Sequence, residues 1–201
     1  MSSTVSTARS ALESRVIQNS LALRLGFALV VIPVLTAAGA ATRIYLPGIP
    51  VPFTLQTLFV ILSGAYLGEM FGPVSMLAYL LYGVLGLNMF AIGDGTGSLN
   101  YLLGISGGYL LAFPLASLLV ARLLRLGFDA SFGRRFVALF SGTLLILASG
   151  LLFALLLHGQ NLTLGDAFLR MFVVFVPFGA VKALLAASCL SAARKRRAMT
   201  R

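Results

Sequence analysis

The chain has 201 residues, of which 59% are hydrophobic and only 10% are charged. An average soluble domain is roughly 25% charged, so this composition excludes an ordinary water-soluble globule, and the high hydrophobicity excludes a disordered chain. The 15 Lys and Arg residues outnumber the 5 Asp and Glu residues and give a net charge of +10. The composition therefore predicts an all-α integral membrane protein with a single membrane domain.

A helix needs about 20 residues to cross a bilayer, so the chain has room for six crossings and for no separate soluble domain. The apolar runs place these helices at residues 25–41, 53–67, 72–87, 106–126, 135–157 and 164–193. Residues 68–73, which link the second and third helices, are expected to form a tight polar turn. We therefore expect an N-terminal tail of residues 1–24, a six-helix membrane domain of residues 25–193 and a basic tail of residues 194–201.

The first apolar run also resembles a secretory signal peptide. Residues 27–40 follow a basic region and end in small residues, Ala38 and Ala40. The rest of the chain is equally apolar, however, and the region before the run is long. We expect this helix to be retained in the mature protein.

Twelve basic residues fall in segments that six crossings place on one side of the membrane. They are Arg9, Arg15, Arg24, Arg122, Arg125, Arg134, Arg135, Arg194, Lys195, Arg196, Arg197 and Arg201. Because Lys and Arg concentrate in cytoplasmic loops, both termini are expected to be cytoplasmic, in a bacterial inner (plasma) membrane. Nucleic-acid binding is disfavoured, because the basic clusters lack the interleaved aromatic residues that stack on bases.

Two segments on the opposite, outer side are not ordinary loops. Residues 43–52 contain three prolines, which exclude a helix, yet the segment is apolar, which favours a lid over a plain interfacial crossover. Residues 88–105 are rich in glycine and carry Asp94, Asn100 and Tyr101. Non-helical backbone at membrane depth is tolerated where it is buried or lines a cavity, although a flexible surface loop is the alternative. Together the two segments predict a pocket that opens outward.

Lys182 is the most informative single residue, because it lies inside the sixth predicted helix. It precedes Arg194 by twelve residues, about 18 Å along a helix, which is too far for easy snorkelling to the inner interface. A lysine at such depth usually faces a cavity and has a partner, so we expect it to meet an anionic or strongly polar ligand. Arg170, near the outer end of the same helix, is expected to be an interfacial anchor.

An enzyme is the alternative from another functional class, because residues 104–107 resemble the nucleophile motif of rhomboid intramembrane proteases. In that interpretation Ser106 is the nucleophile and His158, the only histidine, is the base. The chain has no tryptophan and so lacks that family's Trp-Arg pair, and His158 lies at the end of the fifth predicted helix rather than within the sixth. A transporter is therefore favoured over a protease.

Several sequence blocks resemble the BioY family, the substrate-binding S components of energy-coupling-factor vitamin transporters. The most specific is the Pro-Val-Pro…Leu-Gln-Thr-Leu block of residues 49–58, followed by Ser-Gly-Ala-Tyr-Leu-Gly at residues 63–68. Residues 82–91 and 104–114 match further blocks, and residues 177–182 place a lysine after a Pro-Phe element. The matches follow the family order along most of the chain.

The resemblance implies a six-transmembrane-helix S-component bundle that takes up biotin from the outside, between helices 4 to 6 and the outer loops. It implies that Lys182 contacts the ligand and that Gln56, Ser106 and Tyr109 lie near the site. It also implies partnership with a membrane scaffold protein and ATPases, with self-association as the alternative. The chain has no Gly-x4-Gly-Lys-[Ser/Thr] phosphate loop, so ATP binding by that route is not expected, and biotin is a transported ligand rather than a cofactor.

The chain departs from the family pattern at four points. Gly179 replaces a common Asp, Ile105-Ser106 replaces Pro-Thr, Leu110 replaces an Arg of some members, and Asn88 replaces a Pro. The missing Asp leaves another small carboxylated cofactor, such as lipoate, as an alternative ligand.

Nearby residues are expected to supply the groups that these departures remove. Asp94 is the candidate replacement for the lost carboxylate, and Asn88 and Asn100 can supply amides. Phe90, Tyr101 and Tyr109 can supply apolar walls and hydroxyls. For docking to a scaffold, only Ala37 and Ala41 match the small-residue spacing of S components, and they lie toward the outer end of the first helix.

Overall fold

The computed structural model describes residues 21–91, 98–158 and 163–199. Regular structure within these ranges is helical, apart from an isolated antiparallel pair between Ile44 and Phe53. The elements, in chain order, are η1 (Phe27–Val31), α2 (Ile32–Ala41), α3 (Gln56–Val84), α4 (Ser98–Leu103), α5 (Gly107–Leu111), α6 (Phe113–Leu123), η2 (Leu124–Phe128), α7 (Phe132–His158), α8 (Leu164–Met171), η4 (Val173–Phe175) and α9 (Val176–Met199).

Five stretches of the described chain are helical, long and apolar enough to cross a membrane. They are Leu21–Ala41, Gln56–Val84, Gly107–Phe128, Phe132–Leu157 and Leu164–Arg196. The first includes η1 and α2, the third includes α5, α6 and η2, and the fifth includes α8, η4 and most of α9.

The second stretch, α3, is a hairpin of two antiparallel arms. Gly68 has φ 78° and ψ −169°, which is not helical. A Cβ atom built on Gly72 would lie 3.0 Å from the Cα of Gly64, although eight residues of unbroken helix span about 12 Å. Further from the bend, the Nε2 of Gln56 donates to the hydroxyl of Tyr79 at 2.6 Å. The two arms count as separate crossings, which confirms the predicted six-helix bundle.

The hairpin bend is tighter than the sequence predicted. We expected residues 68–73 to form the turn, but only Gly68 leaves the helical region and the second arm resumes directly after it. The first arm begins at Gln56 rather than at Phe53, because Phe53 is paired with Ile44 through two backbone hydrogen bonds of 2.9 Å.

Proline explains irregularities in the first and last membrane stretches. The first is helical from Leu21, four residues before the predicted start, and its π-helical turn η1 immediately precedes the first turn of α2, which holds Pro33. The last stretch breaks at Phe172, whose φ is −121°, and resumes as α9 with Pro177 in the first turn, where a missing N–H costs little. The sixth predicted helix is therefore two helices joined by a 3₁₀ turn.

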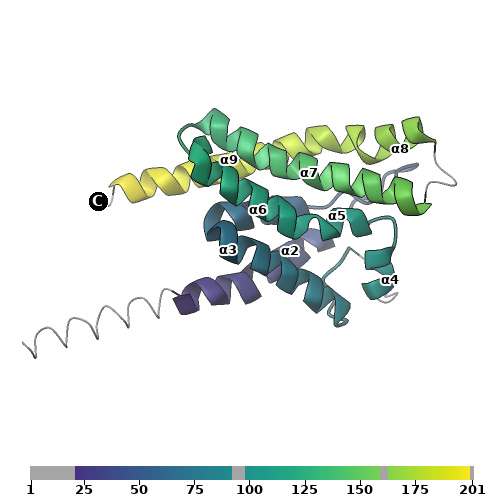
Figure 1. The fold of residues 1–201 in the computed structure, drawn as a ribbon, viewed down its shortest axis with the longest axis horizontal. Coiled ribbons are helices and arrows are strands. Elements are labelled where there is room, and N and C mark those ends of the chain that lie inside the picture. The colour runs from purple at the N-terminus through teal and green to yellow at the C-terminus, as the bar shows by residue number, and fades with distance from the viewer. Residues whose placement is uncertain (1–20, 92–97, 159–162, 200–201) are drawn as a thin grey trace, which may run out of the picture.

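The membrane stretches pack into one bundle, in which α3 contacts α2 and α6, while α7 contacts α5, α6 and α9. Close approach depends on glycine at one contact, where a Cβ atom on Gly64 would collide with the carbonyl of Ser117 in α6. In Figure 1, α4 and α8 lie at the end of the bundle opposite to the C-terminus.

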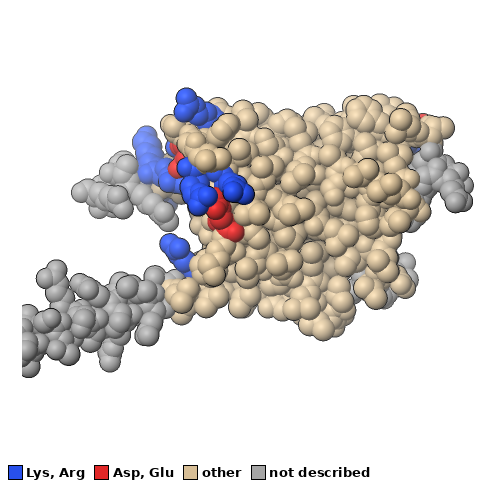
Figure 2. All heavy atoms as spheres, in the orientation of Figure 1, with Lys and Arg blue, Asp and Glu red and all other residues tan. Residues whose placement is uncertain are grey.

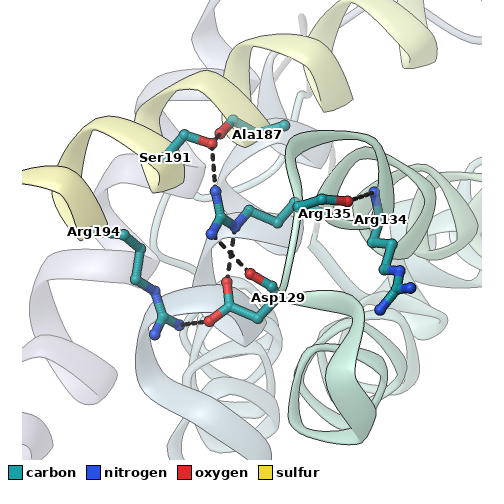
Figure 3. Close-up of polar contacts among 7 residues, drawn as sticks. Asp129, Arg134, Arg135, Ala187, Ser191 and Arg194 are labelled. Carbon is teal, nitrogen blue, oxygen red and sulfur yellow. Dashed lines mark hydrogen bonds and ion pairs between the residues drawn. The ribbon is translucent and has the colours of Figure 1, made fainter.

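Most of the visible Lys and Arg side chains gather at the end of the molecule where the C-terminus lies (Figure 2). At the basic end, Asp129, which follows η2, forms ion pairs with two arginines (Figure 3). Its carboxylate lies 2.9 Å from the Nε of Arg135 and 2.7 Å from an Nη of Arg194, and Arg135 also donates to Ser191 at 2.9 Å. These contacts join the α6–α7 connection to the last turns of α9.

Candidate binding site

A small cavity of about 50 Å³, here called the inner cavity, lies between the Pro-rich outer segment and helices α5, α6, α7 and α9. The residues that line it are Val51, Pro52, Thr54, Thr57, Tyr109, Phe113, Thr143, Leu147, Phe175, Gly179 and Lys182. This is the location that the resemblance implied, between the fourth to sixth predicted helices and the outer loops.

Lys182 lies at the wall of the inner cavity and donates to two residues that follow the Pro-rich segment, the second of them at the start of α3. Its Nζ donates to the carbonyl of Thr54 at 2.7 Å and to the hydroxyl of Thr57 at 2.9 Å. Both acceptors are neutral, and no carboxylate of the described residues forms an ion pair with it. An ammonium group has three donors, so these contacts leave it with one donor and its positive charge available to a ligand.

Tyr109 contributes its ring, rather than its hydroxyl, to the inner cavity. The hydroxyl donates to the carbonyl of Met171 at 2.7 Å, and the ring packs where a Cβ atom on Gly150 would collide with it. The side chain is therefore fixed between α7 and the end of α8, as an apolar wall.

Gly179 leaves room for the side chain of Thr143 on α7. A Cβ atom on Gly179 would lie only 2.6 Å from the Cγ2 of Thr143, which is fully buried. A larger side chain at position 179 would therefore displace Thr143. The pair explains how this bundle packs without the carboxylate that the family pattern places at this position.

A second hollow of about 300 Å³, the outer cavity, lies between the Pro-rich segment and the stretch that leads into α5. Its lining residues are Tyr45, Pro50, Pro52, Asn100, Tyr101, Gly104, Ile105 and Ser106. Burial raises the pKa of Tyr101, while a hydrogen bond with Ser106 opposes that shift. Asn100 is exposed, and Ser106 is buried at the start of α5.

Gln56 and Phe90 are buried but line neither cavity. Gln56 accepts from the hydroxyl of Thr54 at 2.9 Å and donates to Tyr79, whose own hydroxyl donates to the carbonyl of Met89 at 2.7 Å. The ring of Phe90 packs against Tyr79, with centroids 5.6 Å apart. These contacts join the two arms of α3 to the residues that follow the Pro-rich segment and to the connection that follows α3.

Of the four remaining candidates from the sequence, two line neither cavity and two have side chains outside the described residues. Asn88 is exposed and belongs to the lining of neither cavity. Asp94 lies outside the described residues, as does the side chain of His158. Arg170, the expected anchor, is exposed, pairs with Asp166 at 3.7 Å and donates to the carbonyl of Gly48 at 3.4 Å.

The sequence reasoning did not name Thr54, Thr57, Thr143 and Phe175 as site residues. The two threonines that accept from Lys182 fall inside the Pro-rich block that carried the family resemblance, and Thr143 is a polar residue within an apolar membrane helix. Polar residues at membrane depth are themselves a signal of a cavity, and that signal could have identified Thr143. Among the described residues, no cluster of His, Cys, Asp and Glu could hold a metal ion.

Curated relatives and a solved structure resemble this chain. A protein of Pyrococcus horikoshii named "Probable biotin transporter BioY" is 43% identical over 83 residues, which cover 41% of this chain and 49% of the relative. The "Biotin transporter BioY" of Lactococcus lactis is 30% identical over 160 residues, which cover 75% of this chain and 82% of the relative. The crystal structure of an S-component for biotin from an ECF-type ABC transporter matches with a TM-score of 0.76 and 25% identity, over 88% of this chain and 93% of that one.

The chain spans about half or less of the length of three relatives that are more than 40% identical to it. The family assignment rests on wider coverage. The model of the BioY family matches residues 13–199, nearly the whole chain. Together with the six-crossing fold and the lysine that faces a cavity in its last helix, this match shows that the chain belongs to the BioY family.

Proposed function

We propose that this protein is a membrane component that binds biotin on the outer side and takes part in its uptake. The names of the relatives and the biotin S-component with a similar fold support this proposal. The observation that carries it within this chain is Lys182, a cation inside a membrane helix whose described partners are neutral and which lines the inner cavity. The family is one of transporter components, so Ser106 and His158 are not assigned to a protease.

The inner cavity has the chemistry that such a ligand needs. Biotin combines a bicyclic ureido ring with a carboxylated aliphatic tail, and a suitable site combines apolar walls with a few placed polar groups. Phe113, Leu147 and Phe175 supply apolar walls, Thr143 a hydroxyl, and Lys182 a charged donor. The cavity volume of about 50 Å³ is well below the roughly 300 Å³ of small-molecule pockets, so binding requires the Pro-rich segment to move outward.

A second carboxylated cofactor, such as lipoate, is the alternative ligand that one observation favours. None of the residues that line the inner cavity is acidic, and Gly179 stands where the family pattern has Asp. A ureido ring has two N–H donors that need acceptors, whereas lipoate has none. In our proposal the hydroxyl oxygens of the cavity, or Asp94 from outside the described residues, accept from the ureido ring.

The proposed membrane, orientation and partners follow from the family and from the charges. We place both termini on the cytoplasmic side of a bacterial inner membrane, because the basic end shown in Figure 2 fits the positive-inside rule. A membrane scaffold and ATPases are the proposed partners, as the ECF-type match suggests, with self-association as the alternative. Of the small residues expected at a scaffold contact, Ala41 is exposed, whereas Ala37 packs against the core of the bundle.

Equilibrium binding of labelled biotin to the purified protein tests this function. We expect saturable binding at one site, stronger competition by unlabelled biotin than by lipoate, and intermediate competition by dethiobiotin, which keeps the ureido ring. Stronger competition by lipoate than by biotin would identify lipoate as the preferred ligand. Absence of saturable binding of either compound would contradict the transport function.

A further inference from the structure

Five of the polar residues that the sequence assigned to one site are divided between two cavities. Asn100, Tyr101 and Ser106 line the outer cavity, whereas Lys182 and Tyr109 line the inner one. The two linings share a single residue, Pro52. The Pro-rich segment therefore forms a wall between the cavities, and its two faces meet different sets of polar groups.

Several contacts hold this wall in place. Phe53 pairs with Ile44 through its backbone, and its ring stacks on Phe175 with centroids 4.2 Å apart. Directly after it, the carbonyl of Thr54 and the hydroxyl of Thr57 accept from Lys182. Together these contacts hold the wall and the residues that follow it against η4 and α9.

The outer cavity already has the size of a ligand pocket, whereas the inner one does not. The volume of the outer cavity, about 300 Å³, reaches the lower end of the range for small-molecule pockets. None of its eight described lining residues is charged, and their side-chain polar groups are an amide, two phenols and a hydroxyl. A tyrosine phenol is protonated at neutral pH, so Tyr101 can donate a hydrogen bond to a ligand. Such a lining suits a neutral polar ring, and its described residues include no cation that would pair directly with a carboxylate.

A groove on the lateral side of the same segment is the competing route. It has about 290 Å³ and is lined by Thr42, Ile44, Leu46, Phe53, Thr54, Leu55, Phe178 and Lys182. Five of these eight residues are apolar, and Ile44, Leu46, Leu55 and Phe178 are exposed in the way expected of lipid-facing side chains. A water-soluble vitamin that arrives from outside is better matched by the outer cavity.

We propose that the outer cavity is a separate capture site, which binds the neutral polar ring of the ligand before the ligand enters the inner cavity. In the second step the Pro-rich segment moves, and Lys182 exchanges its bonds to Thr54 and Thr57 for bonds to the ligand. Asn100 and Ser106 thus belong to the first complex, and Lys182 to the final one. This inference rests on the proposed function, because it takes the ligand to be biotin.

Stopped-flow mixing of the purified protein with biotin tests the two steps. The chain has no tryptophan and has tyrosines in both cavities, so tyrosine emission can report binding. We expect the observed rate constant to rise hyperbolically with biotin concentration. The half-saturation concentration then measures the capture complex, and the limiting rate measures the release of the wall.

Two substitutions separate the steps. Asn100→Ala removes one neutral hydrogen bond from the capture complex and should raise the half-saturation concentration about three- to tenfold, with an unchanged limiting rate. Thr57→Val removes one acceptor of Lys182 and should raise the limiting rate several-fold, with an unchanged half-saturation concentration. Asn88→Ala is the matched control, because Asn88 is an exposed asparagine outside both cavities, and it should change neither value.

The outcomes distinguish this inference from the function on which it rests. A rate constant that rises linearly with biotin at all accessible concentrations, or equal behaviour of Asn100→Ala and Asn88→Ala, would overturn the capture site while biotin binding stands. An unchanged limiting rate in Thr57→Val would overturn the role of Lys182 in holding the wall. If equilibrium measurements show no biotin binding, the proposed function itself fails.

Discussion

At the scale of single residues, the partners of the Lys182 cation among the described residues are neutral. The carbonyl of Thr54 and the hydroxyl of Thr57 satisfy two of its donors but do not neutralise its charge. An ammonium group at membrane depth is costly unless it is solvated or paired, which is why such residues mark ligand or ion sites. The contacts of Lys182 thus stabilise the closed Pro-rich segment and leave an electrostatic gain for a ligand that brings an oxygen acceptor.

Position 179 sets how closely α9 approaches α7. Gly179→Ala should destabilise the protein by about 1–3 kcal/mol, because the added Cβ would lie 2.6 Å from the Cγ2 of buried Thr143. The double variant with Thr143→Ser should recover most of the loss, since serine keeps the hydroxyl and removes that methyl group. Thermal unfolding in detergent measures both effects.

Gly165→Ala is the control for that substitution. Gly165 is also helical, but a Cβ atom there has no neighbour within 4 Å, so little change in the unfolding temperature is expected. If Gly179→Ala is as stable as Gly165→Ala, the contact between positions 179 and 143 does not constrain the bundle.

Single residues also show where sequence reasoning stops. Lys182 could be identified because a charge inside an apolar helix is conspicuous. The partners of Lys182 could not, because Thr54 and Thr57 reach it only through the fold, from 128 and 125 residues away along the chain. Gln56 also matched a family block, yet it donates to the hydroxyl of Tyr79 and does not line the inner cavity.

At the scale of elements, Gly68 permits the tight hairpin of α3. Its φ of 78° and ψ of −169° fall in a region that is essentially restricted to glycine. No heavy atom lies within 4 Å of a Cβ atom built on Gly68. The requirement for glycine therefore comes from the backbone conformation and not from a lack of space.

Gly68→Ala should therefore lower the free energy of unfolding by about 1–3 kcal/mol, because of backbone strain and without a steric clash. Gly133→Ala provides the comparison, because that glycine lies in α7, has no positive φ, and a Cβ atom built on it also meets no neighbour within 4 Å. The two unfolding temperatures should differ clearly, and equal values would show that the bend tolerates an ordinary residue.

The elements were predictable in number but less so at their ends. Apolar length indicated six crossings, and three prolines correctly excluded a helix over residues 43–52. The short helix α4 and the break at Phe172 were missed, because both depend on packing at the outer end rather than on local composition. The hairpin bend was placed in the right region, but a single glycine sufficed where a six-residue turn was expected.

At the scale of the whole molecule, the charge distribution gives the bundle two unlike ends. The basic end is joined by Asp129, Arg135 and Arg194, whereas the inner and outer cavities adjoin the Pro-rich segment. This separation places ligand capture and the basic surface on opposite faces of the membrane in our proposal. The net charge of +10 indicated such an orientation, but only the fold shows which polar groups share a cavity.

Labelling of introduced cysteines with a membrane-impermeant maleimide tests the orientation. In a Cys189→Ala background, Asn88→Cys in the connection that follows α3 should react in intact cells, because position 88 is exposed on the proposed outer side. Lys195→Cys, at the basic end of α9, should react only after the membrane is permeabilised. The reverse pattern would invert the proposed topology.

The central claim is that biotin binds in the inner cavity at Lys182, and parallel saturation binding of labelled biotin to three proteins tests it most directly. Lys182→Met keeps the length of the side chain but removes a charge-assisted hydrogen bond worth about 1.5–3 kcal/mol, so the Kd should rise at least about tenfold. Lys195→Met, a lysine at the opposite end of the molecule, should bind as the unmodified chain does. Equal affinity of Lys182→Met and the unmodified chain would contradict the assignment of the site.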